Sequence, residues 1–179
     1  MPDELIEMVV ESVRVHMLSN QHVVILKAAE QRRYLPIWIG QWEASAIAMR
    51  LQGFTSERPL THDLFAATLE QLAVHLRRVV VSDLAEETFH ARIQLETDGR
   101  TVEIDSRPSD AIALAVRAAT PIFVTRAVLD RAGVTPAEDD EEGGEGEHRE
   151  DERLSVFREF INSLDTDEES PAEGRRRPD

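Results

Sequence analysis

Residues 33–50 read RYLPIWIGQWEASAIAMR, and residues 100–117 read RTVEIDSRPSDAIALAVR, the same pattern 67 positions later. Both stretches begin and end with arginine, and Glu43 in the first aligns with Asp110 in the second. Alternate alanines follow the acid in each stretch. Chance rarely matches an acid and both flanking arginines without a gap, so the sequence predicts an internal duplication.

Each copy is predicted to be three strands followed by a helix. In the first copy, side chains alternate over residues 9–17, and β-rich runs follow at 22–27 and 34–39. A helix is expected over residues 41–52, with Gly53 closing it.

The second copy is expected to follow the same order. Residues 89–95 alternate between apolar and polar side chains, which is the period of a half-buried strand. Asp98 and Gly99 indicate a hairpin turn, and a return strand is expected at residues 101–105. The next helix is predicted to have Ser109 as its N-cap.

Further elements lie between and after the copies. A helix with a buried stripe is predicted from four apolar residues, Phe65, Leu69, Leu72 and Leu76. Trp38 is expected to pack inside the domain, a final strand to cover residues 121–124, and a short helix to cover 127–132. Strands and helices mix without strict βαβ alternation. The predicted class is therefore α+β, built from a duplicated strand-strand-strand-helix unit. The strands are expected to form either a mixed or antiparallel sheet or a barrel-like core, with the helices packed against it.

The composition fits a folded domain without thiol chemistry. Hydrophobic residues make up 41% of the chain, and the absence of cysteine excludes disulfides, thiol nucleophiles and thiolate metal sites. No apolar run reaches the length of a membrane helix, and the acidic start does not fit a secretory signal. No membrane association is expected, and the expected location is cytoplasmic.

Most of the net charge of −15 lies near the C-terminus. Residues 135–179 hold 17 acids and 6 bases, a net of −11, which leaves −4 for residues 1–134. A domain this close to charge balance argues against tight, non-specific binding of nucleic acid.

Four segments are predicted along the chain. They are a folded domain, an acidic disordered linker, a short amphipathic helix and a disordered tail, at residues 1–134, 135–151, 152–165 and 166–179. The helix is expected to dock either on its own domain or on a partner.

Several segments resemble the bifunctional nuclease family. Residues 34–40, YLPIWIG, with the Glu-Ala pair that follows, are similar to its opening motif, and residues 58–64, RPLTHDL, to its second. Residues 106–115, SRPSDAIALA, resemble the third motif, and PIFV at 121–124 follows as it does in the family. Residues 157–161, FREFI, resemble a C-terminal extension of bacterial members.

The resemblance implies a duplicated α+β fold, a homodimer, and cleavage of both DNA and RNA as weakly bound substrates. Trp42 departs from the family pattern, which has a small or polar residue there, and is expected to narrow a cleft beside Glu43.

Phosphodiester hydrolysis needs carboxylates for a divalent metal, a base for water, and cations for the phosphorane charge. The resemblance and these needs together assign a metal site for Mg²⁺ or Mn²⁺ to Asp63, Asp110 and Glu43. The catalytic candidates are a general base, a phosphate clamp of two arginines and a nearby hydroxyl, namely His62, Arg58, Arg107 and Ser109.

The same residues have a structural interpretation. Acids in the first turn of a helix complement its dipole and cap free N–H groups without doing chemistry. The alternative hypothesis is therefore a non-catalytic, dimeric binding or regulatory module for an anionic ligand or a partner protein.

Overall fold

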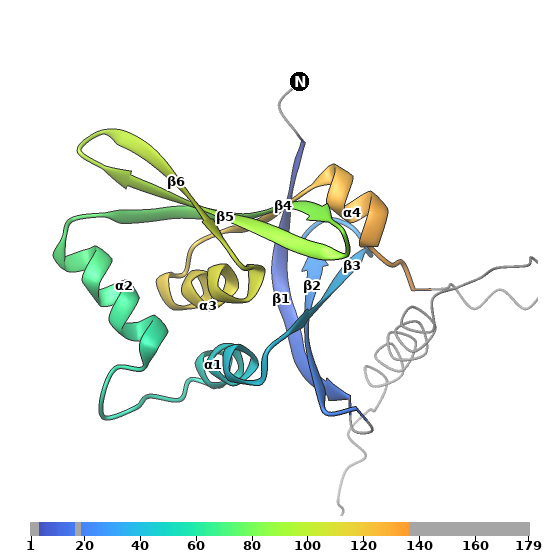
Figure 1. Cartoon of the computed structure of the whole chain (residues 1–179), viewed down its shortest axis with the longest axis horizontal. Helices are drawn as coiled ribbons and strands as arrows, with labels where there is room; N and C mark the ends of the chain where they lie inside the picture. The colour runs from blue at the N-terminus through green and yellow to red at the C-terminus, as the bar shows by residue number, and fades with distance from the viewer. Residues whose placement is uncertain (1–3, 17–18, 137–179) are drawn as a thin grey trace, which may run out of the picture. The chain divides into compact units, whose positions relative to one another are not determined.

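Two copies of one unit account for most of the fold in the computed structural model, which describes residues 4–16 and 19–136 (Figure 1). The first copy consists of β1 (Leu5–His16), β2 (Gln21–Ala28), β3 (Tyr34–Ile39) and α1 (Gln41–Leu51). The second consists of β4 (His75–Ala85), β5 (Thr88–Thr97), β6 (Arg100–Ser106) and α3 (Pro108–Ala118). A shift of 67 positions places α1 on α3 from end to end. The predicted duplication is confirmed in the order of its elements.

Three elements stand outside the copies. They are α2 (Thr61–Gln71), β7 (Ile122–Thr125) and α4 (Arg126–Ala132). The predicted final strand and short helix are confirmed by β7 and α4. No helix in the described part of the chain is long and apolar enough to cross a bilayer.

Within the described residues, seven strands form a sheet in the order β3-β2-β1-β7-β4-β5-β6. Neighbours are antiparallel except β4 and β7, which are parallel. The α+β class and the mixed sheet are confirmed. The sheet is open, so the barrel-like alternative is wrong.

Each copy packs its helix on its own strands. α1 contacts β1 and β2, α3 contacts β4 and β5, and α1 and α3 contact each other. Figure 1 shows α1, α2 and α3 on one side of the bent sheet. The side chains of Val24, Leu26, Ile47, Ile112 and Leu114 are buried in the core there. Removing this apolar surface from water stabilises the fold.

Local turn chemistry agrees with the sequence at two positions. Asp98 and Gly99 have φ of 49° and 71°, the left-handed conformation that a two-residue hairpin turn requires. Gly53, with φ of 72°, follows α1 directly after its C-cap.

Other expectations need correction. The N-cap of α3 is Arg107, with Pro108 at the first helical position, so Ser109 is not the cap. α2 ends at Gln71, and Phe65 and Leu72 are exposed, so only Leu69 and Leu76 pack against the core. The predicted buried stripe is wrong because Phe65 is exposed within α2 and the helix ends before Leu72 and Leu76.

Trp38 also differs from its prediction. Its side chain is 37% exposed, although its neighbours on β3 pack in the core or against it. Trp42 in α1 is 79% exposed. The chain up to Gly133 forms one compact unit. The predicted linker, amphipathic helix and tail lie outside the described residues, apart from the first two positions of the linker, and stay predictions.

Candidate active site

Three helices begin close together, and each contributes a polar side chain from its first turn. Glu43 lies in the first turn of α1 and Asp110 in the first turn of α3. His62 is the second residue of α2. Because α1 and α2 both pack against α3, these three side chains converge.

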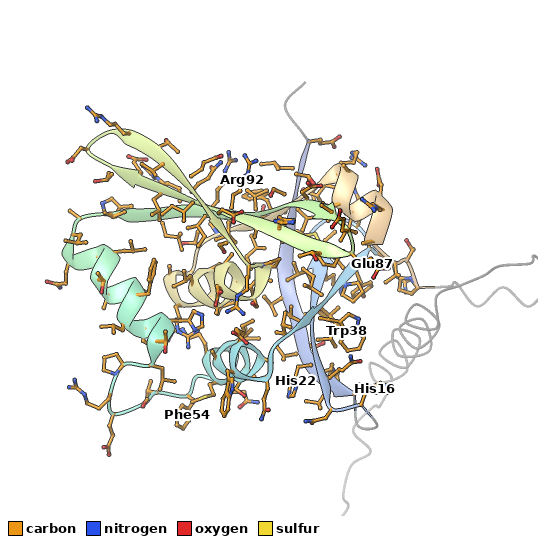
Figure 2. All side chains as sticks on the ribbon, viewed as in Figure 1. His16, His22, Trp38, Phe54, Glu87 and Arg92 are labelled. Atoms are coloured by element: carbon orange, nitrogen blue, oxygen red, sulfur yellow. The ribbon has the colours of Figure 1, made fainter. Side chains whose placement is uncertain are left out.

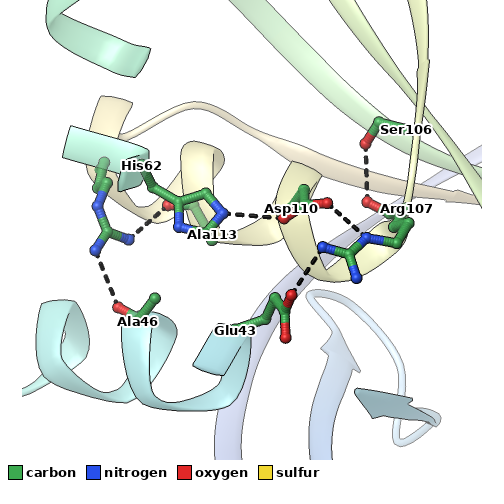
Figure 3. A network of polar contacts seen from close by, with 8 residues as sticks. Glu43, Ala46, His62, Ser106, Arg107, Asp110 and Ala113 are labelled. Carbon is green, nitrogen blue, oxygen red and sulfur yellow. Dashed lines mark hydrogen bonds and ion pairs between the residues drawn. The ribbon is translucent and has the colours of Figure 1, made fainter. Parts of the chain in front are cut away.

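Hydrogen bonds join them through Arg107 (Figure 3). Arg107 Nη2 donates to Glu43 Oε1 at 2.7 Å, and Arg107 Nε donates to Asp110 Oδ2 at 2.7 Å. The other oxygen of Asp110, Oδ1, lies 3.1 Å from His62 Nε2. We call Glu43, Arg107, Asp110 and His62 the Arg107 network.

The network lies where the two copies of the duplication meet. Glu43 and Asp110 are equivalent in the repeat, and one guanidinium binds both. Gly40 is the position equivalent to Arg107. A Cβ atom at Gly40 would lie 2.3 Å from Glu43 Oε2. The missing side chain therefore lets the Glu43 carboxylate lie over the start of α1.

The neighbours of Asp110 in the network favour its ionised form. Burial raises the pKa of Asp110, but hydrogen bonds from Arg107 and His62 outweigh it and leave that pKa below its ordinary value. Asp110 is then an acceptor only at neutral pH. Since a carboxylate only accepts, His62 Nε2 is the donor in its contact with Asp110, and Nδ1 is the second nitrogen of the ring.

Solvent reaches the network mainly at Arg107. Its side chain is 64% exposed, whereas Glu43 is 16% and His62 15% exposed. Hydrogen bonds to Asp110 and Glu43 raise the pKa of Arg107, so the guanidinium stays charged. An anion approaching from solvent would meet this cation first.

Asp63 belongs to a different cluster. Its Oδ1 accepts a hydrogen bond from Arg117 Nε, and its Oδ2 accepts one from the backbone N–H of Leu60 at the start of α2. Burial raises the pKa of Asp63, but these two hydrogen bonds lower it by more than burial raises it. The pKa of Asp63 is therefore below its ordinary value.

Arg117 is the residue that the sequence interpretation missed. Its side chain is only 6% exposed and also donates to the carbonyl oxygens of Ala113 and Ala46, at 2.9 and 3.2 Å. These two alanines are equivalent in the repeat. The sequence did hold a signal for this role, namely the matched arginines at the end of each repeat. An arginine among alanines on a packed helix face needs hydrogen-bond acceptors nearby.

The two remaining candidates lie apart from the network or at its edge. Arg58 is exposed between α1 and α2 and makes no hydrogen bond or ion pair with another described residue. Ser109 is only 5% exposed, in the first turn of α3. Its position follows Arg107 by two residues, beside the network.

With this geometry established, comparison with known proteins identifies the family. The bifunctional nuclease domain matches residues 24–137, which include every member of the Arg107 network. The chain belongs to the bifunctional nuclease domain family.

Two relatives of this family member differ in how much of their length matches. An uncharacterized protein of Mycobacterium tuberculosis is 41% identical over 162 residues, which is 90% of this chain and 96% of that protein. Bifunctional nuclease 1 of Oryza sativa subsp. indica is 24% identical over 135 residues. That match covers 70% of this chain but 41% of the rice protein.

The three predicted metal ligands do not meet at one point, because Glu43 and Asp110 lie together but Asp63 lies in a different cluster. Across residues 4–16 and 19–136, no three His, Asp or Glu side chains form a group that could hold a metal ion. Arg107 lies between Glu43 and Asp110, where a shared cation would bind, and Asp63 contacts Arg117 instead. The present arrangement therefore does not fit a three-carboxylate metal site.

Proposed function

We propose that this chain is a nuclease that hydrolyses phosphodiester bonds of DNA and RNA at the Arg107 network. The observation that carries the proposal is the hydrogen-bonded line of acid, arginine, acid and histidine contributed by three helices. Membership of the bifunctional nuclease domain family supports the reaction class. A divalent metal and a cytoplasmic location stay predictions from the sequence.

In this proposal His62 acts as the general base. Asp110 holds the imidazole by Nε2, and Nδ1 takes a proton from water as the water oxygen attacks phosphorus. The new P–O bond forms while the bond to the leaving oxygen breaks, and the leaving oxygen takes a proton from solvent.

Arg107 is proposed to bind the phosphate. Its bonds to the two carboxylates use Nε and Nη2 and leave the N–H groups of Nη1 for a phosphate oxygen. Glu43 and Asp110 fix the guanidinium plane before substrate arrives. A preorganised cation of this kind stabilises charge that develops in the transition state. Two neighbouring carboxylates weaken its attraction for a polyanion, which agrees with weakly bound substrates.

An Asp110→Asn variant tests the proposal with single-stranded DNA and RNA. The amide has no charge and can donate as well as accept, so it no longer fixes which nitrogen of His62 carries the proton. Cleavage is therefore expected to fall by at least about 100-fold. Asp130→Asn is the matched control, because Asp130 also pairs with an arginine, Arg33, at 2.7 Å but lies outside the network.

The proteins are purified in parallel, and each assay is repeated with chelator and with added Mn²⁺. Equal cleavage by wild type and Asp110→Asn would contradict the proposed site. Activity that depends on Mn²⁺ would support the metal site that the sequence predicts.

An exposed apolar surface favours the alternative, a binding module. Large apolar side chains on α1, α2 and the segments that follow them are exposed, namely Trp42, Leu51, Phe54, Leu64, Phe65 and Leu72. Exposed large apolar side chains are candidates for a protein contact, and these six supply the surface on which the alternative rests. If the purified chain cleaves neither DNA nor RNA, these exposed side chains favour the binding module over the nuclease.

The homodimer is proposed on the same surface. Leu64 on α2 is 59% exposed, and a Leu64→Glu variant should convert a dimer to a monomer because it places a charge in the apolar contact. Light scattering measures the mass of both proteins, with Glu70→Gln on the same helix as the control. A monomeric wild type would contradict the dimer.

A further inference from the structure

A cavity of about 560 Å³ opens beside the Arg107 network. Arg107 and Ser109 form one wall, and Trp38 and Gly40 of the first copy form another. The start of β5 adds Phe89. Its size falls in the range of roughly 300–1,000 Å³ that is usual for sites of small organic groups.

Both copies of the duplication line this cavity with equivalent positions. His22 in β2 aligns with Phe89 in β5, and Gly40 aligns with Arg107, at the shift of 67 residues. The copies have diverged here, because one supplies an imidazole and a glycine where the other supplies a phenyl ring and an arginine. The cavity therefore has a guanidinium at one of these two equivalent positions and no side chain at the other.

The lining combines flat rings with hydrogen-bonding groups. Trp38 is 37% exposed and Phe89 is half-buried, and both aromatic residues line the cavity. The amide of Gln21, the imidazole of His22 and the hydroxyl of Ser109 line the same space. Figure 2 shows Trp38, His22 and Glu87 on the same side of the domain.

We propose that this cavity binds one base of a single-stranded nucleic acid, with the base stacked on Trp38 and the adjoining phosphate held by Arg107. This inference rests on the proposed nuclease function and adds the substrate class: an unpaired strand. A base within a duplex has both faces stacked on its neighbours, whereas an unpaired base exposes a face to an aromatic side chain.

The chemistry of the lining favours a nucleobase over a simple anion. A free phosphate needs only the cation, and Arg107 already supplies that at the mouth of the cavity. Aromatic rings and neutral hydrogen-bonding groups match the faces and edges of a base. Stacking tolerates every base, which agrees with a nuclease that acts on both DNA and RNA.

Tryptophan fluorescence of the full chain tests the proposal. Trp38 and Trp42 are the two tryptophans, so a Trp42→Phe background reports on Trp38 alone. Titration with a short oligothymidylate should quench this signal to saturation. An abasic oligonucleotide of the same length should quench it weakly, because it offers phosphate without a base.

Affinity, measured by anisotropy of a labelled oligonucleotide, gives the second readout. Trp38→Ala should weaken binding by about 5- to 150-fold, and Trp38→Phe, which keeps a ring, should retain most of it. Phe54→Ala is the matched control, because Phe54 is also an exposed aromatic residue, at 55%, but lies outside the cavity.

The outcomes separate the two proposals. Cleavage by wild type with unchanged affinity in Trp38→Ala would overturn the base site and leave the nuclease intact. Saturable quenching without cleavage would keep the base site and overturn the nuclease. Equal quenching by the abasic strand would overturn the base site, since phosphate alone would then explain binding.

Discussion

A His62→Gln variant is expected to lower the turnover of phosphodiester cleavage by roughly 10²- to 10⁴-fold, the usual contribution of a general base. Glutamine can still donate a hydrogen bond to Asp110, so the contact at 3.1 Å has a neutral replacement. It has no group that accepts a proton from water near neutral pH. The variant should therefore fold normally and bind oligonucleotide with unchanged affinity while cleaving it slowly.

His90→Gln provides the control for this measurement, because His90 is an exposed histidine on β5 outside the Arg107 network. Initial rates and the thermal midpoint are measured for all three proteins. If His62→Gln cleaves like wild type but melts at a lower temperature, His62 is a structural histidine and the base lies elsewhere. If both histidine variants lose activity together, the loss is not specific to the Arg107 network, and His62 is not the base.

The duplication could be predicted because both copies keep the residues that determine their elements. Alternation along the strands, the Asp98-Gly99 turn and the glycine after α1 are local signals, and each was realised. The convergence of Glu43 and Asp110 followed from their equivalence. Arg107 was named as a phosphate clamp, but its bonds to both acids depend on how α1 packs on α3, which no local pattern reports.

Other features depend on contacts between distant segments. The sequence places His62 and Asp63 side by side on α2, yet His62 faces Asp110 and Asp63 faces Arg117. Adjacent residues on a helix point about 100° apart, so neighbours in sequence seldom share a site. Trp38 was expected to pack because it sits between two isoleucines, but its side chain is 37% exposed and lines the cavity. Strand alternation places it on the opposite face of β3 from these isoleucines.

An Asp63→Asn variant should lower the free energy of unfolding by about 1.5–3 kcal/mol at neutral pH and leave nuclease activity intact. Asp63 is the only charged partner of the Arg117 side chain among the described residues, and that side chain is 6% exposed. An amide in its place leaves a guanidinium inside the helix layer without a counter-charge. Because Asp63 is 38% exposed, solvent screens the pair, which keeps the expected cost below that of a fully buried ion pair.

The pH dependence of this loss identifies its cause. Since folding lowers the pKa of Asp63, the pair contributes its full stability above the ordinary aspartate pKa and loses it as pH falls through the lowered value. Urea unfolding of wild type and Asp63→Asn should therefore differ at neutral pH and converge on acidification, whereas Asp110→Asn should lose activity with less effect on stability. A stable but inactive Asp63→Asn protein would instead return Asp63 to the active site and favour the metal that the sequence predicts, because only a functional carboxylate would abolish cleavage without weakening the fold.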